Sequence, residues 1–450
     1  MALLRDAWAL AIEALSWMDM RKLSERLAFT RTVRQLSIRD SDALRLAHML
    51  VLETVKRRNL IDKFINITIQ PRILEEFDLG VQAFLRLYVY QTRLAGSRNV
   101  TNLEEAENIA KLARSILGWK TLQEVEPFLG LLLTQKTSVV FCNVSDEERV
   151  GLATYHPTWF VKYCFRVFGR TETINMLEAD TQTPPTYMRL NTLKTDETTI
   201  LQTLAKEDVK VEKIEQLKST YKILHTKAPL TKTASYRQSL FYIQDKASCF
   251  AAEATDPKPE TTVLDVCAAP GAKTTYLAQL MQNHGVIYSL DYSRRRMSVW
   301  KNETRRMGVE IAEPIIADAC EPLPFQIEAD LVILDPPCTS TGTFGRLPSS
   351  KWRLTPRSIN RMAGIQWQML NNCANYVKQE GKLVYSTCSI TVEENEMQIE
   401  RFLKHHSDFQ LVPITPKIGI SGMRGLDKCQ RLYPHLHQCN GFFIAKLQKE

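Results

Sequence analysis

The sequence predicts a protein of several domains, with an all-α N-terminal region, a small α+β region and a C-terminal α/β region built on a doubly wound parallel sheet. Three observations lead to this fold class. Apolar residues recur at helical spacing up to about residue 140, short strand patterns follow Gly151, and strands alternate with helices from Thr262 onward. A length of 450 residues is ample for three domains, which we place at residues 1–140, 150–245 and 246–450.

The N-terminal region is predicted to be entirely helical. Apolar residues repeat at steps of three and four over residues 24–36, 41–57, 81–95 and 103–117. Charged residues from Arg5 to Asp19 interrupt the first stretch, so it is an amphipathic helix and not a signal peptide. A loose basic group at Arg21, Lys22, Arg31 and Arg34 is more simply a solvated face than an RNA contact.

Composition sets broad limits on the class of protein. The net charge of +8 permits a polyanionic partner without requiring one. No run approaches the 18 apolar residues of a membrane span, so we expect no membrane partner. The ten cysteines form no C-x-x-C pair, which is typical of reduced thiols in a cytoplasmic protein. We predict no metal site, and we expect a monomer.

The middle region has the pattern of a small α+β domain. Strand candidates cover residues 187–193, 209–214, 221–224 and 241–245. Tyr187 and Tyr221 are interleaved with basic residues, a composition that suits RNA. A charged strand face explains the same residues equally well. The basic residues are Arg189, Lys194, Lys206, Lys210, Lys213 and Lys218.

In the C-terminal region, chemically useful residues follow the ends of the predicted strands. We place the strands at residues 262–266, 286–290, 313–317, 331–334 and 382–386. Parallel sheets bind ligands beyond the carboxyl ends of their strands. The residues found there are Cys267–Lys273, Asp291, Asp318, Asp335, Cys338 and Cys388.

The stretch from Thr262 to Thr274 reads as a buried strand, a tight turn and the start of a helix. Backbone N–H groups can approach a ligand at such a turn. The glycine patterns of a phosphate loop and of a dinucleotide fold are both incomplete, because Gly271 is the only glycine present. Asp291 lies 20 residues after Gly271, the spacing of a ribose-binding carboxylate. S-adenosylmethionine fits these features, and a βαβ unit with no ligand remains the alternative.

The Asp335-Pro336-Pro337-Cys338 segment favours methylation at carbon. The related loops that hold an exocyclic amino group carry an aromatic residue where this chain has Cys338. Cytosine C5 becomes nucleophilic when a thiolate adds to C6, and a carboxylic acid can assist at N3. Cys388, Cys338, Asp335 and Lys273 therefore form a plausible catalytic set. Each also has a structural explanation: a buried thiol, a capped turn or a solvated lysine.

Three motifs together resemble the NOL/NOP/Sun family of RNA cytosine-C5 methyltransferases: residues 267–274, 335–342 and 385–389. The resemblance extends to Lys351-Trp352-Arg353, to residues 393–396, and to residues 431–435 and 441–443. It covers residues 150–450 and implies a Rossmann-like methyltransferase domain beside an RNA-binding module. The helical region is similar in type to the NusB-like domain of the bacterial 16S ribosomal RNA branch.

The resemblance implies roles for the matching positions. Cys388 would be the nucleophile, Cys338 would assist release of the product, and Lys273 and Asp335 would act near the cytosine. Ala272 departs from the family's usual glycine and Pro336 from a frequent alanine. The residues implied to surround S-adenosylmethionine are Cys267, Ala268, Ala269, Pro270, Gly271, Ala272, Lys273, Asp291, Arg296, Asp318 and Asp335.

The sequence thus predicts a methyltransferase that acts on C5 of a cytosine in RNA. Ribosomal 16S RNA is favoured over transfer RNA because of the helical N-terminal region. The alternatives are a transfer RNA cytosine-C5 methyltransferase, an amino-methyltransferase, and an RNA-binding ribosome-assembly factor without catalysis. We also expect the loop Thr343–Arg353 to contact RNA phosphates through Arg346, Lys351 and Arg353.

Overall fold

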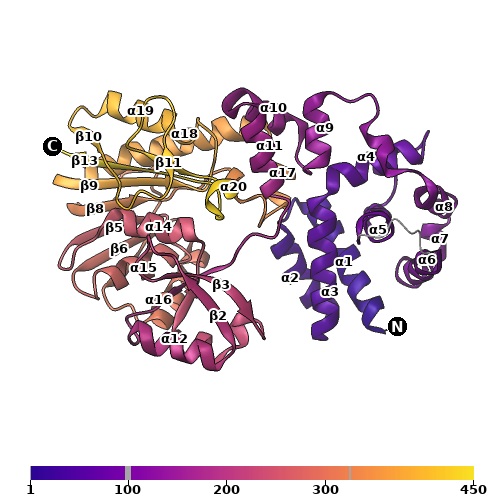
Figure 1. The fold of residues 1–450 in the computed structure, drawn as a ribbon, viewed down its shortest axis with the longest axis horizontal. Coiled ribbons are helices and arrows are strands. Elements are labelled where there is room, and N and C mark those ends of the chain that lie inside the picture. Colours follow the sequence, from indigo (N-terminus) through magenta and orange to yellow (C-terminus); the bar gives the residue numbers. More distant parts are fainter. Residues whose placement is uncertain (1, 97–102, 324–325) are drawn as a thin grey trace. The chain divides into compact units, whose positions relative to one another are not determined.

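The computed structural model describes residues 2–96, 103–323 and 326–450, which form two compact units (Figure 1). The helical unit comprises Met1–Thr181 together with the short segment Arg346–Leu354. The sheet unit comprises Gln182–Gly345 and Thr355–Glu450. The boundaries at residues 140, 150 and 245 stay a prediction.

The helical unit contains all four helices predicted from apolar spacing. The pattern over residues 81–95 becomes α5 followed by a π turn, and Ser24 caps α2 by accepting a hydrogen bond from Leu27 N. Trp8 and Phe84 are among the large side chains buried in its core. The helices are α1 (Ala2–Arg21), α2 (Glu25–Leu36), α3 (Ser41–Lys56), α4 (Arg58–Thr68), α5 (Leu79–Val89), α6 (Leu103–Leu117), α7 (Trp119–Leu122), α8 (Glu126–Thr134), α9 (Asp146–Ala153), α10 (Thr158–Phe168), α11 (Arg170–Ala179) and α17 (Ser349–Arg353).

The segment Arg346–Leu354 packs inside the helical unit, although it is inserted in the sequence of the sheet unit. Trp352 packs against the helical core and donates a hydrogen bond from Nε1 to Val55 O at 2.6 Å. Lys351 is only 2% exposed, and burial lowers its pKa to about 7. A lysine buried in this way cannot present its charge to an RNA phosphate. The expectation that Lys351 contacts RNA is therefore wrong.

The small domain of the sheet unit is an antiparallel sheet in the order β2-β3-β1-β4. Its strands are β1 (Tyr187–Leu190), β2 (Val209–Lys213), β3 (Thr220–Thr226) and β4 (Phe241–Ile243), with helices α12 (Glu197–Lys206) and α13 (Ala234–Arg237). Arg189 is fully buried, and its Nη2 lies 2.8 Å from Thr275 Oγ1. Arg189 thus joins the small sheet to the next domain, and only the lysines of the basic set are exposed.

The large sheet has the order β11-β12-β13-β9-β8-β5-β6-β7, and β10 pairs with β13. The five predicted strands are all present and parallel. They are β5 (Thr262–Val266), β6 (Val286–Asp291), β7 (Ala312–Ile316), β8 (Ala329–Leu334) and β9 (Val377–Thr387). The sequence did not predict the antiparallel additions β10 (Phe409–Val412), β11 (Ile420–Ser421), β12 (Gln430–Leu432) and β13 (Phe442–Lys449).

Alternate residues of the central strands face two separate cores, as expected for a sheet covered on both sides. Val263 and Ile333 pack in one core, and Leu264 and Leu334 pack in the other. Helices cover the two faces, with α18 and α19 above the sheet in Figure 1 and α14 and α15 below it. The helices are α14 (Lys246–Thr255), α15 (Ala272–Leu280), α16 (Arg294–Met307), α18 (Pro356–Cys373), α19 (Glu396–His405) and α20 (Pro434–His437).

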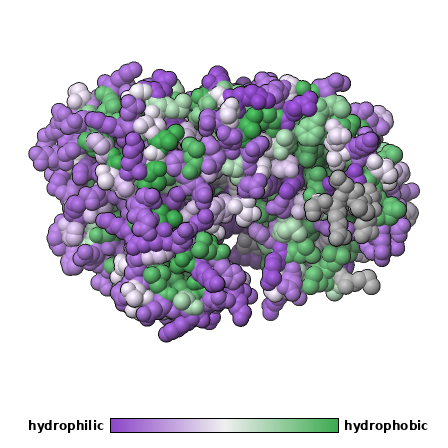
Figure 2. All heavy atoms as spheres, viewed as in Figure 1, coloured by the Kyte–Doolittle hydropathy of each residue, from purple (hydrophilic) through white to green (hydrophobic). Residues whose placement is uncertain are grey.

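On the face drawn in Figure 2, hydrophobic residues form several groups among hydrophilic ones. Within the part of the chain that the structure describes, no helix is long and apolar enough to cross a membrane.

Candidate active site

Two cysteines meet where the predicted strand ends converge. Cys338 lies in the loop after β8, and Cys388 follows β9 directly. Their Sγ atoms are 3.2 Å apart, and Ser340 Oγ lies 3.5 Å from Cys388 Sγ. The structure therefore brings together two thiols that are 50 positions apart in the sequence.

The surroundings of the two thiols differ in their effect on acidity. The hydrogen bond from Cys338 lowers the pKa of Cys388, and Ser340 and Lys273 act in the same direction against burial. The same bond, together with burial, raises the pKa of Cys338 well above its ordinary value. The thiolate form is the nucleophile in cysteine chemistry, so Cys388 is the better placed of the two to attack.

The close approach of the two cysteine loops requires a glycine at position 342. Gly342 N donates a hydrogen bond to Cys388 O at 2.9 Å, and Gly342 O accepts one from Gly441 N at 2.8 Å. A Cβ atom at position 342 would lie only 2.2 Å from Gly441 O. Any side chain there would push the loop that carries Cys338 away from Gly441 and strain its hydrogen bond to Cys388 O.

Lys273 and Asp335 form an ion pair at the neighbouring strand ends. Ser386 Oγ also donates to Asp335 Oδ1, at 3.3 Å. Burial acts to lower the pKa of Lys273, but the charge and hydrogen bond of Asp335, together with the nearby Asp265 and Cys388, outweigh burial and raise this pKa. The pair thus places a carboxylate and an ammonium next to the thiols, where they can act on the polar edge of a base.

The loop Cys267–Gly271 connects β5 to α15, as predicted from the sequence. Asp265 inside β5 accepts a hydrogen bond from Thr274 Oγ1 at 2.5 Å, and burial raises the pKa of Asp265 to about 7. Gly271 has φ of +109°, in the region that favours glycine. Ala272 is the first residue of α15 and requires no such conformation. The loop leaves backbone groups at the start of a helix, where a ligand can approach them.

Asp291 ends β6, and its carboxylate is buried beside this loop. Oδ1 accepts a hydrogen bond from Ser293 N at 3.0 Å, and Oδ2 lies 3.1 Å from Arg296 Nη1. Oδ2 accepts no hydrogen bond within the described residues, so it keeps acceptor capacity for a ligand. Arg296 also donates to Ala269 O and so ties α16 to the loop. These features fit the ribose end of S-adenosylmethionine.

Among the described residues, Asp318 makes no hydrogen bond or ion pair to the other predicted site residues. It follows β7 and is exposed, and its Oδ1 accepts a hydrogen bond from Cys320 N at 2.9 Å. It shares the carboxyl edge of the sheet with Asp291, because β6 and β7 are parallel neighbours. Its predicted contact with the methyl donor stays a prediction.

Sequence reasoning missed several polar residues around the thiols. Ser340 lies within hydrogen-bond distance of Cys388, and the fully buried Glu394 accepts hydrogen bonds from both cysteine loops. Glu394 lies in residues 393–396, which resemble the family, but the sequence alone indicated no role for it. Neither residue could be placed without the fold, because their partners are distant in the sequence.

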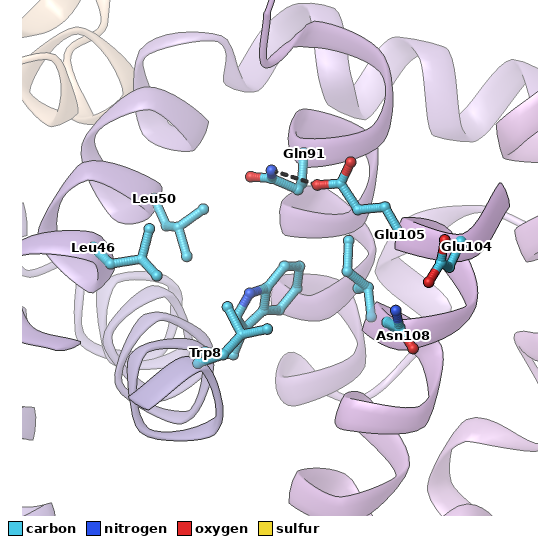
Figure 3. A pocket seen from close by; sticks show the side chains of 9 residues that line it. Trp8, Leu46, Leu50, Gln91, Glu104, Glu105 and Asn108 are labelled. Atoms are coloured by element: carbon cyan, nitrogen blue, oxygen red, sulfur yellow. Dashed lines mark hydrogen bonds between the residues drawn. The ribbon is translucent and has the colours of Figure 1, made fainter. Parts of the chain in front are cut away.

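A pocket of about 400 Å³ lies in the helical unit (Figure 3). Trp8, Leu46 and Leu50 contribute apolar surface, and Gln91 hydrogen bonds to Glu105 at 2.8 Å beside them. Two glutamates at this pocket disfavour binding of an RNA phosphate backbone. None of the predicted catalytic or donor-binding residues lines it.

The chain is similar to known RNA methyltransferases. Residues 252–448 match the family model of the 16S rRNA methyltransferase RsmB/F, and residues 156–226 match the ferredoxin-like domain of RsmF/B-like methyltransferases. The chain is 33% identical over 319 residues to the probable ribosomal RNA small subunit methyltransferase B of Synechocystis, covering 68% of this chain and 70% of that protein.

Two further similarities span nearly the whole chain. The probable ribosomal RNA small subunit methyltransferase B of Bacillus subtilis is 29% identical, with 98% of each chain covered. The crystal structure of PH0851 matches with a TM-score of 0.81 and 29% identity, covering 99% of both chains. The fold class predicted from the sequence is confirmed: a helical N-terminal region, a ferredoxin-like domain and a Rossmann-like methyltransferase domain. The chain belongs to the RsmB/F family of S-adenosylmethionine-dependent RNA cytosine-C5 methyltransferases.

Proposed function

We propose that the protein methylates C5 of a cytosine in 16S ribosomal RNA through a covalent bond between Cys388 and C6 of the base. The observation that carries this proposal is the pair of thiols 3.2 Å apart next to the Lys273–Asp335 ion pair. Two thiols, a carboxylate and an ammonium meet at one edge of the sheet. Amino-group methylation needs no thiol, so this set favours carbon as the acceptor.

The methyl donor would lie against the loop after β5 and the end of β6. Cys267–Gly271 would contact it through the backbone, and Asp291 would accept hydrogen bonds from its ribose. When bound, S-adenosylmethionine supplies an electrophilic methyl group to C5. Asp318 would complete the donor site from the end of β7.

In the proposed reaction, the Cys388 thiolate adds to C6 of cytosine and gives C5 the character of an enamine carbon. The Lys273–Asp335 pair would face the N3 edge of the base, where the Lys273 ammonium can donate a hydrogen bond and stabilise the negative charge that develops on the ring. After methylation, the C5 proton must leave and the Cys388–C6 bond must break, which restores the aromatic ring. Cys338 would assist this last stage, since its Sγ lies beside the sulfur that departs.

The two pKa directions support the assignment of Cys388 as the nucleophile. The pKa of Cys388 is lowered and that of Cys338 is raised. Near neutral pH the thiolate therefore forms preferentially at Cys388, while Cys338 keeps its proton. A protonated Cys338 can stabilise the sulfur of Cys388 as it leaves C6.

The choice of 16S RNA rests on the relatives and on the chain's extent. The relatives in Synechocystis and Bacillus subtilis are named for the RNA of the small ribosomal subunit, and the second matches over 98% of both chains. The helical region is thus part of the similarity. A relative that acts on transfer RNA would be expected to differ in the domain that selects the RNA.

Bisulfite sequencing tests the substrate. We expect one 16S cytosine to lose its methylation in cells that lack the protein, and to regain it when the wild-type gene is restored. The Cys388→Ala gene should not restore it. Loss of methylation in a transfer RNA alone would contradict the 16S assignment, and rescue by Cys388→Ala would contradict the catalytic role of that thiol.

A further inference from the structure

One buried carboxylate, that of Glu394, connects the two cysteine loops. Glu394 is fully buried in the turn between Cys388 and α19. Its side chain accepts hydrogen bonds from Thr339 in one loop and from Ser389 in the other. Thr339 directly follows Cys338, and Ser389 directly follows Cys388.

The contacts occupy both carboxylate oxygens. Oε2 accepts from Thr339 N at 2.8 Å and from Gln366 Nε2 at 2.9 Å. Oε1 accepts from Ser389 Oγ at 2.6 Å, from Thr391 Oγ1 at 2.8 Å, and from Thr339 Oγ1. These five donors are uncharged groups, and together they fill the roughly four lone-pair sites of an ionised carboxylate.

The neighbouring polar contacts add to the same junction. Gln366 also donates to Pro337 O at 3.0 Å, so α18 supports the backbone just before Cys338. Tyr385 in β9 donates from its hydroxyl to Glu394 O at 2.6 Å. The position of Glu394 is therefore fixed from the sheet and from α18 at the same time.

We propose that Glu394 is a positioning residue that sets the separation of the two thiols. This inference rests on the proposed function for its catalytic consequence, but the thiol geometry that it concerns can be measured without methyl transfer. Without an acceptor at Glu394, Thr339 N would be buried with no partner, which is unfavourable, and the hydroxyls of Thr339 and Ser389 would keep only each other and the neighbouring threonine hydroxyls. The two loops would then shift toward other partners, and Cys338 and Cys388 would separate.

Glu394→Gln is the sharpest perturbation, because it keeps the size of the side chain and replaces one acceptor oxygen with an NH₂ donor. At the Oε2 position that donor would face Thr339 N and Gln366 Nε2, which can only donate, and at the Oε1 position it would force the hydroxyls that now donate to the carboxylate to find other acceptors. The matched control is Glu400→Gln, a change of the same type on α19, where Glu400 pairs with Arg424 at 2.9 Å at the surface. Both variants would be made in the full chain, and each would be checked by thermal melting.

The first measurement is the rate at which the oxidant diamide links Cys338 to Cys388. The two thiols lose two protons and two electrons to form the disulfide, and diamide takes them up to become a hydrazine. Peptide mass spectrometry separates this disulfide from those of the other cysteines. We expect Glu394→Gln to slow this cross-link at least tenfold and Glu400→Gln to leave it unchanged.

The second measurement is steady-state methylation of 16S RNA. A positioning role predicts a fall in kcat of at least tenfold for Glu394→Gln, with little change in the KM for either substrate. Wild-type cross-linking and kcat in a folded Glu394→Gln would overturn the inference. Slow cross-linking in Glu394→Gln with no methylation by the wild-type protein would support the positioning role while contradicting the proposed function.

Ser389→Ala serves if Glu394→Gln does not fold. It removes a single donor and keeps the carboxylate with its other partners. A cross-linking rate of Ser389→Ala that is clearly below the wild-type rate would support the inference. An unchanged rate and an unchanged kcat in Ser389→Ala would then overturn it.

Discussion

Replacing Lys351 with methionine should stabilise the helical unit and change how its stability depends on pH. Lys351 is 2% exposed, and burial lowers its pKa from 10.5 to about 7. Asp180 opposes this effect, and Lys56 and Arg57 add to it. Burial lowers the pKa of His156 to about 4, and the nearby charge of Lys351 acts in the same direction.

The magnitude follows from the difference in proton binding between the two states. Between pH 7 and 10.5 the unfolded lysine keeps its proton, while the folded lysine loses it. The free energy of unfolding therefore rises with pH in this window. From pH 7 to pH 9 Lys351 alone should contribute a rise of about 2 kcal/mol, since each unit of pH is worth at most about 1.4 kcal/mol. Other lysines with lowered pKa values, such as Lys446, add to the slope of the wild type.

The assay is urea denaturation at pH 7, 8 and 9, followed by tryptophan fluorescence. Five of the seven tryptophans, Trp8, Trp17, Trp119, Trp159 and Trp352, lie in the helical unit. We expect Lys351→Met to be more stable than the wild type at pH 7 by about 2–4 kcal/mol, with a difference that shrinks by about 2 kcal/mol by pH 9. Lys120→Met, a change at an exposed lysine of the same unit, is the control. Equal pH slopes for Lys351→Met and the wild type would refute the reasoning.

Three further predictions concern the sheet unit. Asp291→Ala should weaken S-adenosylmethionine binding by about 1.5–3 kcal/mol, roughly 10–150-fold in calorimetry, whereas Asp291→Asn keeps an acceptor for Ser293 N and should lose less; unchanged affinity in the alanine variant would remove Asp291 from the donor site. Ser340→Ala should raise the pKa of Cys388, so that the pH profile for its alkylation by iodoacetamide moves to higher pH; an unmoved profile would show that Ser340 does not stabilise the thiolate. Gly342→Ala should abolish methylation while keeping donor affinity, since the new Cβ would meet Gly441 O at 2.2 Å; normal turnover would contradict the required close approach.

The parallel core of the sheet unit could be predicted from the sequence because most of its strands contain a short apolar run that is followed by a polar residue. The strands β10 to β13 were missed because they pair antiparallel to distant partners and have no such sharp ends. The sequence predicted that Cys338 and Cys388 share one pocket, because both follow parallel strands at the carboxyl edge of the sheet. It did not predict that Glu394 accepts hydrogen bonds from both cysteine loops, because these contacts join residues up to 55 positions apart.

Residues 346–354 show a second limit of sequence reasoning. The sequence predicts that Arg346, Lys351 and Arg353 contact RNA phosphates, since cations neutralise the phosphate backbone. Burial makes this wrong for Lys351, and for the two arginines it stays a prediction. Local sequence does not reveal that Trp352 anchors this segment in the helical core through Val55. Lys351, next to Trp352, is buried with this segment and so cannot present its charge to a phosphate.

The most direct test of covalent catalysis compares two single variants on a denaturing gel after incubation with 16S RNA and S-adenosylmethionine. Cys338→Ala should run as a slow band linked to RNA, because Cys388 can still attack C6 but release is impaired. Cys388→Ala should run as free protein and transfer no methyl group. An RNA-linked band from Cys388→Ala would assign the nucleophile to Cys338, and methylation by both variants without any linked band would contradict catalysis through either thiol.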